Sequence, residues 1–262
     1  FDMDDWEARE NLGYSLGIIP KSKAEYLTAQ FAKRSKYCIA ASRYLENYLL
    51  QFNKRVYYLP TGVDTDFFVP TAYKKKKEIV FSWHGSVNRV EILNYIKLII
   101  DCFLLLYKKY PDIKLFIRGD GIFGEQLVSL IKGYNCKDIK HYGWTDYENI
   151  SDYLDDIDVG LIPLLDRTHF NLSKSPVKLF EYMAKAKGVI ASPVGEAGFV
   201  IKDGYNGFLA LNKEEFIFGM EKLINNQDLL RRLGMNASKT VKEKYSLAVI
   251  EEKFHNIIVE NL

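Results

Sequence analysis

From residue 78 onward, short apolar runs alternate with amphipathic stretches along the chain. This alternation is typical of repeated strand-helix units on a parallel sheet. The run EIVFSWHG, residues 78–85, predicts the first strand. The next stretch places its isoleucines and leucines on one helical face and then meets Pro111, which predicts a core-facing helix over residues 91–110.

The same pattern continues to the end of the chain. Further strands are expected at KLFIRGDG, DIKHYGW, DVGLIPL, KGVIAS and NGFLA, and further helices at residues 124–132, 150–154 and 176–185. After residue 212, helical periodicity interrupted at Asn225-Asn226 and at Gly234 predicts several consecutive helices. The fold class is therefore α/β, with a Rossmann-like, doubly wound parallel sheet and C-terminal helices.

The N-terminal part of the chain follows a different pattern. It contains a helix-like stretch at residues 23–32, then a strand-like KYCIAAS, a helix-like RYLENYLLQF and a strand-like VYYLP. We interpret residues 1–69 as the remnant of an N-terminal α/β domain with its linker, 70–240 as the Rossmann-like domain, and 241–262 as a C-terminal helix that packs back toward the N-terminal part. The lysine run at residues 74–77 is expected to be a solvated linker, with a functional basic patch as the alternative.

Charge and cysteine content narrow the function classes. The 262 residues carry 36 basic and 34 acidic side chains, a formal net charge of +2, so anion binding must come from local placement, and nucleic acid is not the expected partner. Three cysteines without metal-like spacing argue against a disulfide framework and favour the cytoplasm. The histidines are scattered, which gives a metal site no support. The apolar run near residues 91–110 falls short of the roughly 18 residues that span a bilayer.

The stretch SKSPVKLFEYMAKAKGVIAS indicates an anion site. Ser175 suits the N-cap and Pro176 the first position of a helix, so Lys178 falls in the first turn and Lys174 just before it. Helix N-termini favour negative charge, so the two lysines fit best around a bound phosphate. The alternative is that both point into water and Lys178 pairs with Glu181. Glu181, one turn on, suits the vicinal hydroxyls of a sugar, which together with the phosphate site indicates a nucleotide or nucleotide-sugar pocket.

The longer segment SPVKLFEYMAKAKGVIASPVGEAGFVIKDGYNGFLA resembles the donor-binding signature of retaining glycosyltransferases of family four, which have the GT-B fold. The similarity extends through GVDTDFF, KYPDIKLFIRGDG, HYGWTDYENISDYLDDIDVGLIPL and LLRRLGMNASKTVKEKYS, and so covers nearly the whole chain. In that family, the C-terminal domain binds the nucleoside diphosphate sugar and the N-terminal domain binds most of the acceptor.

The resemblance implies roles for individual residues. Glu181 resembles the acid that binds the ribose, and Lys178, together with Lys174 or Arg89, resembles the cations on the diphosphate. Gly143 and Trp144 fall where a strand-end loop contacts the base. The predicted catalytic residues are Lys178, Glu181 and Arg89, and the predicted donor-binding residues are Gly85, Lys174, Ser175, Lys178, Glu181, Gly143, Trp144, Asn171 and Ser173.

The sequence also departs from the family pattern. The family carries a glutamate eight residues before the position of Glu181, whereas this chain has Ser173, so Asn171 or Ser173 is expected to take over hydrogen bonding to the sugar. WHGSVNR lacks the arginine that usually follows Gly85, and Arg89 is assigned in its place. Because family members carry a full N-terminal α/β domain, the acceptor half is expected to be largely missing.

Three other patterns have competing interpretations. GDGIFG matches the dinucleotide fingerprint, but that fingerprint belongs after the first strand of its domain, so an NAD oxidoreductase is the weaker reading. His84, at the end of the first strand, either lines the cleft or is structural. Asp158, with the neighbouring aspartates, favours a cap or turn role over a carboxylate site. The loop at residues 195–198 either lies near the phosphates or base or is a plain turn.

The resemblance implies that a hexose moves from a UDP or GDP carrier to a hydroxyl of a glycan or lipid-linked glycan, with retention and without a metal or other cofactor. Polysaccharide, glycolipid and glycoprotein synthesis all stay open. The expected location is the cytoplasm or the inner face of the membrane, with any membrane contact peripheral and made through the missing half. The alternatives are a non-catalytic nucleotide-sugar binding module and a sugar-nucleotide epimerase of the same fold.

Overall fold

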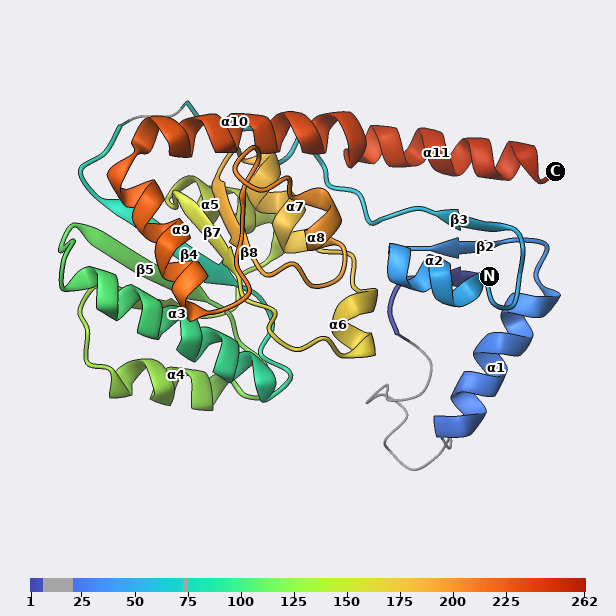
Figure 1. The fold of residues 1–262 in the computed structure, drawn as a ribbon, viewed down its shortest axis with the longest axis horizontal. Coiled ribbons are helices and arrows are strands. Elements are labelled where there is room, and N and C mark those ends of the chain that lie inside the picture. The colour runs from blue at the N-terminus through green and yellow to red at the C-terminus, as the bar shows by residue number, and fades with distance from the viewer. Residues whose placement is uncertain (7–20, 73–74) are drawn as a thin grey trace.

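The computed structural model describes residues 1–6, 21–72 and 75–262. Within these residues the chain forms two α/β units that lie side by side and are bridged by the linker and by the last helix (Figure 1). The smaller unit contains a three-stranded parallel sheet and the larger a six-stranded parallel sheet. The predicted α/β class with a doubly wound parallel sheet is confirmed. Lys74 of the predicted linker run lies outside the described residues.

The smaller unit is built from residues before the linker. Its elements are β1 (Asp2–Met3), α1 (Lys21–Arg34), β2 (Cys38–Ala40), α2 (Arg43–Leu49) and β3 (Val56–Tyr58), with the strands in the order β1-β2-β3. Ser42 caps α2, because its side chain accepts a hydrogen bond from the Leu45 amide at 3.2 Å. Met3, Trp6, Leu45 and Leu49 contribute to a small core of its own.

The larger unit has the strand order β6-β5-β4-β7-β8-β9. The strands are β4 (Ile79–His84), β5 (Ile113–Arg118), β6 (Ile139–Tyr142), β7 (Val159–Ile162), β8 (Gly188–Ala191) and β9 (Phe208–Leu209). Every strand predicted for this part of the chain is present. The central strand β4 is buried along its whole length, including the polar residues Ser82 and His84, so both of its faces are packed.

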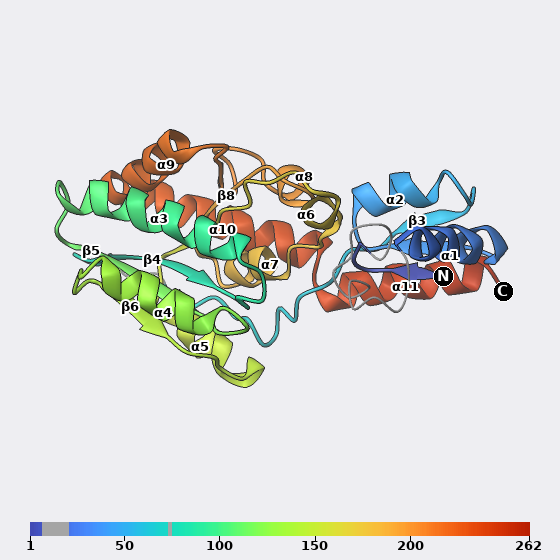
Figure 2. The same ribbon diagram turned by 90° about the horizontal axis from the view of Figure 1, so that it is seen from below.

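Helices cover both faces of this sheet (Figure 2). They are α3 (Glu91–Tyr107), α4 (Gly124–Gly133), α5 (Ile150–Asp155), α7 (Val177–Ala184), α8 (Ala197–Val200), α9 (Lys213–Asn225) and α10 (Gln227–Lys244), whereas the short α6 (His169–Ser173) lies beyond the sheet, toward the smaller unit. Phe81 of β4 packs with α3, α4 and α9 on one face, and the adjacent Val80 packs with α5, α7 and α10 on the other. The larger unit therefore has two hydrophobic cores, one on each side of the sheet.

The C-terminal helices differ from the prediction in one respect. Gly234 does not interrupt α10; a Cβ there would lie 2.0 Å from the Ala186 carbonyl oxygen, so the glycine lets the helix pass close to the loop before β8. The predicted division after residue 240 falls inside α10, and the following helix, α11 (Leu247–Glu260), continues from it across the smaller unit beside β3 (Figure 1). Asn261, after α11, donates a hydrogen bond to the Tyr57 hydroxyl at 3.0 Å.

Two general features complete the description. Among the described helices, none is both long and apolar enough to cross a membrane. All three cysteines are free thiols, and Cys38 and Cys102 are buried.

Candidate functional site

Two adjoining cavities open at the carboxyl ends of the strands of the larger unit, where parallel sheets bind ligands. We call them the Glu181 cavity, of about 310 Å³, and the Arg89 cavity, of about 560 Å³. The Glu181 cavity also includes His84, Gly85, Arg118, Trp144 and Tyr147, and the Arg89 cavity includes Trp83, Tyr95, Asn171, Lys174, Ser175, Val194 and Ala197. Ser86, Val177 and Lys178 line both cavities, so Lys178 stands where the two meet.

The start of α7 places Lys178, although the predicted cap is wrong. The helix begins at Val177, and Ser175 does not cap it. The Ser175 hydroxyl instead accepts a hydrogen bond from the Thr61 amide at 3.0 Å, because the chain leaving β3 supplies a competing donor. Ser175 thus joins the site to the neighbouring chain.

Lys178 lies closely against the loop after β4. Its Nζ is 5.1 Å from the centroid of the Trp83 ring. Gly85 has φ of 152°, and a Cβ on it would lie 1.8 Å from Nζ of Lys178. A side chain at position 85 would therefore displace the ammonium group.

Two lysines of the Arg89 cavity, Lys178 and Lys174, are poorly compensated by negative charge, although Glu91 and Asp166 also line the cavity. Burial, followed by the charge of Lys174, lowers the pKa of Lys178 to about 8. Burial also lowers the pKa of Lys174, although Asp5 opposes this and Arg89 adds to it. Among the described residues, neither lysine forms an ion pair. A bound anion would supply the missing negative charge.

Phe170 of α6 is a platform for two of these cations. The Lys174 Nζ lies 4.0 Å from the centroid of the ring, and the Arg89 Cζ lies 4.6 Å from it. Arg89 also contacts Glu91, with Nε 3.5 Å from Oε2. The structure therefore brings Arg89 to the same cavity as Lys174 and Lys178, as its predicted role requires.

Glu181 is held by a buried hydrogen-bond chain. Its Oε2 lies 2.8 Å from Nε2 of His84, and the His84 Nδ1 lies 2.8 Å from the Tyr182 hydroxyl. Burial lowers the pKa of His84, so the ring is neutral and donates from Nε2 to the carboxylate, while Nδ1 contacts the Tyr182 hydroxyl. Glu181 is only 7% exposed, and the other oxygen of its carboxylate, Oε1, has no hydrogen-bond partner among the described residues. His84 lines the cavity and also fixes the orientation of Glu181.

Asn171 and Ser173 differ in where they point. The Asn171 Nδ2 donates to the Tyr95 hydroxyl at 3.1 Å and to the Asp166 carbonyl oxygen at 2.9 Å, which orients the amide on the wall of the Arg89 cavity. Ser173 is fully buried, donates to the Phe170 carbonyl oxygen at 2.9 Å and lines neither cavity. Of the two residues predicted to contact the sugar, the structure brings only Asn171 to a cavity.

Of the two residues predicted to contact the base, Gly143 and Trp144, only one reaches a cavity. Trp144 lines the Glu181 cavity and is 66% exposed, whereas Gly143 lines neither cavity. Sequence reasoning missed Arg118 at the end of β5, whose Cζ lies 4.3 Å from the centroid of Tyr153 and which lines the Glu181 cavity. Its Nη1 donates to the Gly143 carbonyl oxygen at 3.5 Å. The available signal was its position at the carboxyl end of a strand.

Of the Asp158 and GDGIFG patterns, only the second reaches the site, because Gly119 lines the Glu181 cavity. Asp158 precedes β7, accepts from the Val80 amide at 2.9 Å and pairs with Lys76 at 3.3 Å, as suits a structural turn. The GDGIFG loop follows β5 and is tied to the loop after β4, because the Val87 amide donates to the Asp120 carbonyl oxygen at 2.8 Å. No cluster that could hold a metal ion occurs among the described residues.

Comparison with solved structures shows that the chain has the GT-B fold. Staphylococcus aureus TarM, solved with fondaparinux, alpha-GlcNAc-glycerol and UDP, aligns with a TM-score of 0.73 at 22% identity, over 98% of this chain and 50% of that chain. Anabaena HepE, solved with UDP and glucose, aligns with a TM-score of 0.72 at 17% identity, over 89% and 66%. The C-terminal domain of a group 1 glycosyltransferase from Francisella tularensis aligns with a TM-score of 0.58 at 22% identity, over 71% and 100%.

The chain belongs to the family of glycosyl transferases group 1, whose model matches residues 63–240. An uncharacterized glycosyltransferase of Methanocaldococcus jannaschii is 26% identical over 232 residues, which are 82% of this chain and 56% of the relative. Poly(ribitol-phosphate) alpha-N-acetylglucosaminyltransferase of Staphylococcus aureus is 26% identical over 180 residues, which are 66% of this chain and 34% of the relative. The chain thus spans about half of the first relative and about a third of the second.

Proposed function

We propose that this chain is a retaining glycosyltransferase of family four and that its larger unit binds a nucleoside diphosphate sugar across the two cavities. The nucleoside occupies the Glu181 cavity, the diphosphate lies at Lys178, and the hexose extends into the Arg89 cavity. The observation that carries the proposal is the position of Lys178, a cation without an ion-pair partner among the described residues, where the two cavities meet.

The nucleoside half of the proposal rests on Glu181. One carboxylate oxygen is engaged by His84, and the other faces a cavity whose rim carries Trp144. A fixed carboxylate is a suitable acceptor for the two vicinal hydroxyls of a ribose, and an aromatic ring at the rim is a suitable surface for a base. Hydrogen bonds to a charged group of this kind contribute about 1.5 to 3 kcal/mol each.

In the diphosphate half of the site, positively charged side chains would stabilise the negative charge that develops during the reaction. When the bond between the anomeric carbon and the diphosphate breaks, negative charge develops on the leaving group beside Lys178, Lys174 and Arg89. Cations that are already in place stabilise such charge without reorganisation, which is commonly the largest catalytic contribution. The resemblance to family four implies that the acceptor hydroxyl attacks from the same face and that its proton passes to the departing phosphate.

Several finer assignments belong to the same proposal. We favour UDP over GDP as the carrier, because TarM and HepE were both solved with UDP. The acceptor would be a hydroxyl of a glycan or lipid-linked glycan, and the donor site requires no metal or other cofactor. The location would be the cytoplasm or the inner face of a membrane, in polysaccharide, glycolipid or glycoprotein synthesis.

Calorimetric titration of the chain with UDP, GDP, ADP and inorganic pyrophosphate tests the proposal. UDP is expected to bind more tightly than pyrophosphate, because the nucleoside adds contacts in the Glu181 cavity. If GDP is the best ligand, the choice of carrier is wrong but the donor site stands. Equal binding of all four ligands would reduce the site to a general anion site, and absence of binding would contradict the proposal.

A nucleotide-sugar binding module without transfer is the second candidate, and Ser173 favours it. The family places a sugar-contacting glutamate at this position, whereas Ser173 is buried against the Phe170 carbonyl oxygen. Release of UDP from a UDP-hexose, measured with and without added glycan acceptors, separates the two candidates. A chain that binds the donor tightly but never releases UDP would be a binding module.

A further inference from the structure

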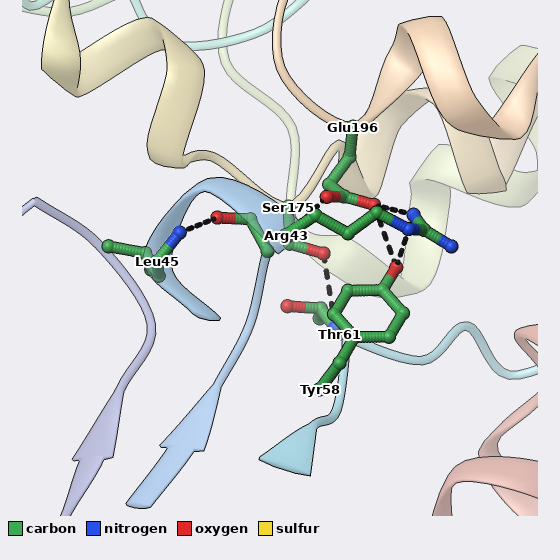
Figure 3. A network of polar contacts seen from close by, with 7 residues as sticks. Arg43, Leu45, Tyr58, Thr61, Ser175 and Glu196 are labelled. Carbon is green, nitrogen blue, oxygen red and sulfur yellow. Dashed lines mark hydrogen bonds and ion pairs between the residues drawn. The ribbon is translucent and has the colours of Figure 1, made fainter. Parts of the chain in front are cut away.

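Glu196 is a buried carboxylate of the larger unit, and among the described residues the hydrogen-bond partners of its side chain belong to the smaller unit. It lies just before α8 and is 1% exposed. Its Oε1 accepts a hydrogen bond from the Arg43 amide at 2.5 Å, and its Oε2 pairs with the Arg43 Nη1 at 2.5 Å. The Tyr58 hydroxyl donates to the same Oε2 at 2.7 Å (Figure 3). We call these three residues the Glu196 clasp.

The clasp is more than a surface ion pair. A carboxylate this deeply buried loses its hydration, and removal of one partner would leave an uncompensated charge inside the interface. Arg43 is held further by two aromatic rings, with Cζ 4.4 Å from the centroid of Tyr58 and 4.9 Å from that of Phe199. Burial, followed by the charge of Glu196, raises the pKa of Tyr58, so the hydroxyl stays a donor at neutral pH.

The residues on either side of Glu196 form a wall of the Arg89 cavity. Val194 and Ala197 both line it. Between them, Gly195 has φ of 61°, and a Cβ there would lie 2.8 Å from the Asn171 carbonyl oxygen, so the loop runs tightly against α6. The position of Glu196 is therefore transmitted directly to the cavity wall.

A second wall of the same cavity is also held from the smaller unit. The His169 ring of α6 stacks on Trp6 with 4.8 Å between centroids and forms a hydrogen bond with the Tyr44 hydroxyl. Phe170, the platform for Arg89 and Lys174, packs against the core of the smaller unit. By contrast, among the described residues no hydrogen bond or ion pair joins the lining of the Glu181 cavity to residues 1–60.

We propose that Glu196 is a positioning residue for the sugar and phosphate half of the donor site. The affinity of the Arg89 cavity for its ligand then depends on the contacts that Arg43 and Tyr58 make with Glu196. This inference rests on the proposed function, which assigns the nucleoside to the Glu181 cavity and the sugar to the Arg89 cavity. Since coupling is reciprocal, donor binding must strengthen the clasp as much as the clasp strengthens donor binding.

The test compares ligands that fill one cavity with ligands that fill both. Uridine, UDP and UDP-glucose are titrated calorimetrically into the full chain and into Glu196→Gln, which keeps the size of the side chain but removes its charge. We expect the affinity for UDP-glucose to fall about tenfold, within the usual range of coupling between sites, while the affinity for uridine changes less than about twofold. Glu125→Gln removes an exposed carboxylate from α4, away from the clasp, and is the matched control, with unchanged affinities.

A double-mutant cycle keeps the test independent of a general loss of stability. Arg43→Met and Glu196→Gln are each expected to weaken UDP-glucose binding, and the double variant is expected to be no weaker than Glu196→Gln alone, because both changes break one contact. Thermal unfolding of each variant confirms that it is folded before titration.

Two outcomes would overturn the inference alone. One is an equal loss of uridine and UDP-glucose affinity in Glu196→Gln, which would indicate a general structural role. The other is an unchanged affinity for UDP-glucose. If the unmodified chain bound none of the three ligands, the proposed function would fail and this inference with it.

Discussion

The two cavities differ in what holds their walls. In the Glu181 cavity, the key carboxylate is oriented by His84 and Tyr182, all within the larger unit. In the Arg89 cavity, α6 and the loop at Glu196 are held by residues of the smaller unit. The comparison teaches that half of the proposed donor site is complete within one unit, whereas the other half is shaped by an interface between units.

The largest expected effect is on Lys178, where the two cavities meet. Lys178→Ala should weaken the binding of UDP about a hundredfold, because it removes a charged contact to the diphosphate from a partly dry site. The affinity for uridine should stay nearly unchanged. Calorimetric titration with uridine and UDP measures the difference. Lys239→Ala, on the exposed surface of α10, is the matched control. An equal loss for both ligands would place Lys178 on the nucleoside and remove the boundary between the cavities.

The next largest effect concerns the Glu181 cavity alone. Glu181→Ala should weaken the binding of uridine and of UDP by the same factor, on the order of tenfold to a hundredfold, because it removes charge-assisted hydrogen bonds to the ribose. The same titrations check this, and binding of 2′-deoxyuridine to the unmodified chain supplies an independent comparison. If the deoxynucleoside bound the unmodified chain as tightly as uridine, Glu181 would not contact the 2′-hydroxyl.

The pH dependence separates the cavities without a mutation. The free protein holds Lys178 protonated below its pKa of about 8, so UDP affinity should be nearly flat between about pH 7, where the terminal phosphate of UDP is ionised, and that pH. Above it, binding must recover a proton, and UDP affinity should fall by at most about tenfold per pH unit. Uridine affinity should not follow this curve. Titration at pH 7 and 9 in buffers of different ionisation enthalpy measures the proton uptake, and Lys178→Arg should abolish it. Flat UDP affinity in the unmodified chain up to pH 9 would contradict the assignment.

The sequence predicted the fold of the larger unit well, because its signals are local. Buried parallel strands such as β8 appear as continuous apolar runs, and α3 appears as a stripe of apolar residues. Lys178 and Glu181 could be associated with one another since they lie within one turn of a single helix. The chemistry of the Glu181 cavity was therefore visible in one short segment.

The contacts of the other cavity could not be predicted in this way. Arg43 and Glu196 are 153 positions apart, and no periodicity links two charges at that separation. Ser175 was expected to cap α7, but its hydroxyl receives the Thr61 amide from a distant segment. The short helix α6, which carries Phe170 and Asn171, lacked the length that makes a helical stripe visible. Arg118 of the Glu181 cavity was also missed, but most of the missed contacts lie at the interface between the units.

The smallest expected effect is on Arg118, and it decides whether the Glu181 cavity reads the base. Arg118→Met keeps an unbranched side chain against Tyr153 but removes the guanidinium donors, so uridine and UDP should each lose about fivefold in affinity, the value of one or two hydrogen bonds. Titration with uridine and UDP checks this, and Lys140→Met, on the neighbouring strand β6, is the control. A loss for UDP without a loss for uridine would mean that Arg118 acts on the phosphates. In that case the phosphate contacts would extend into the cavity that is built within one unit, and the division between the two cavities would lie closer to Trp144 than to Lys178.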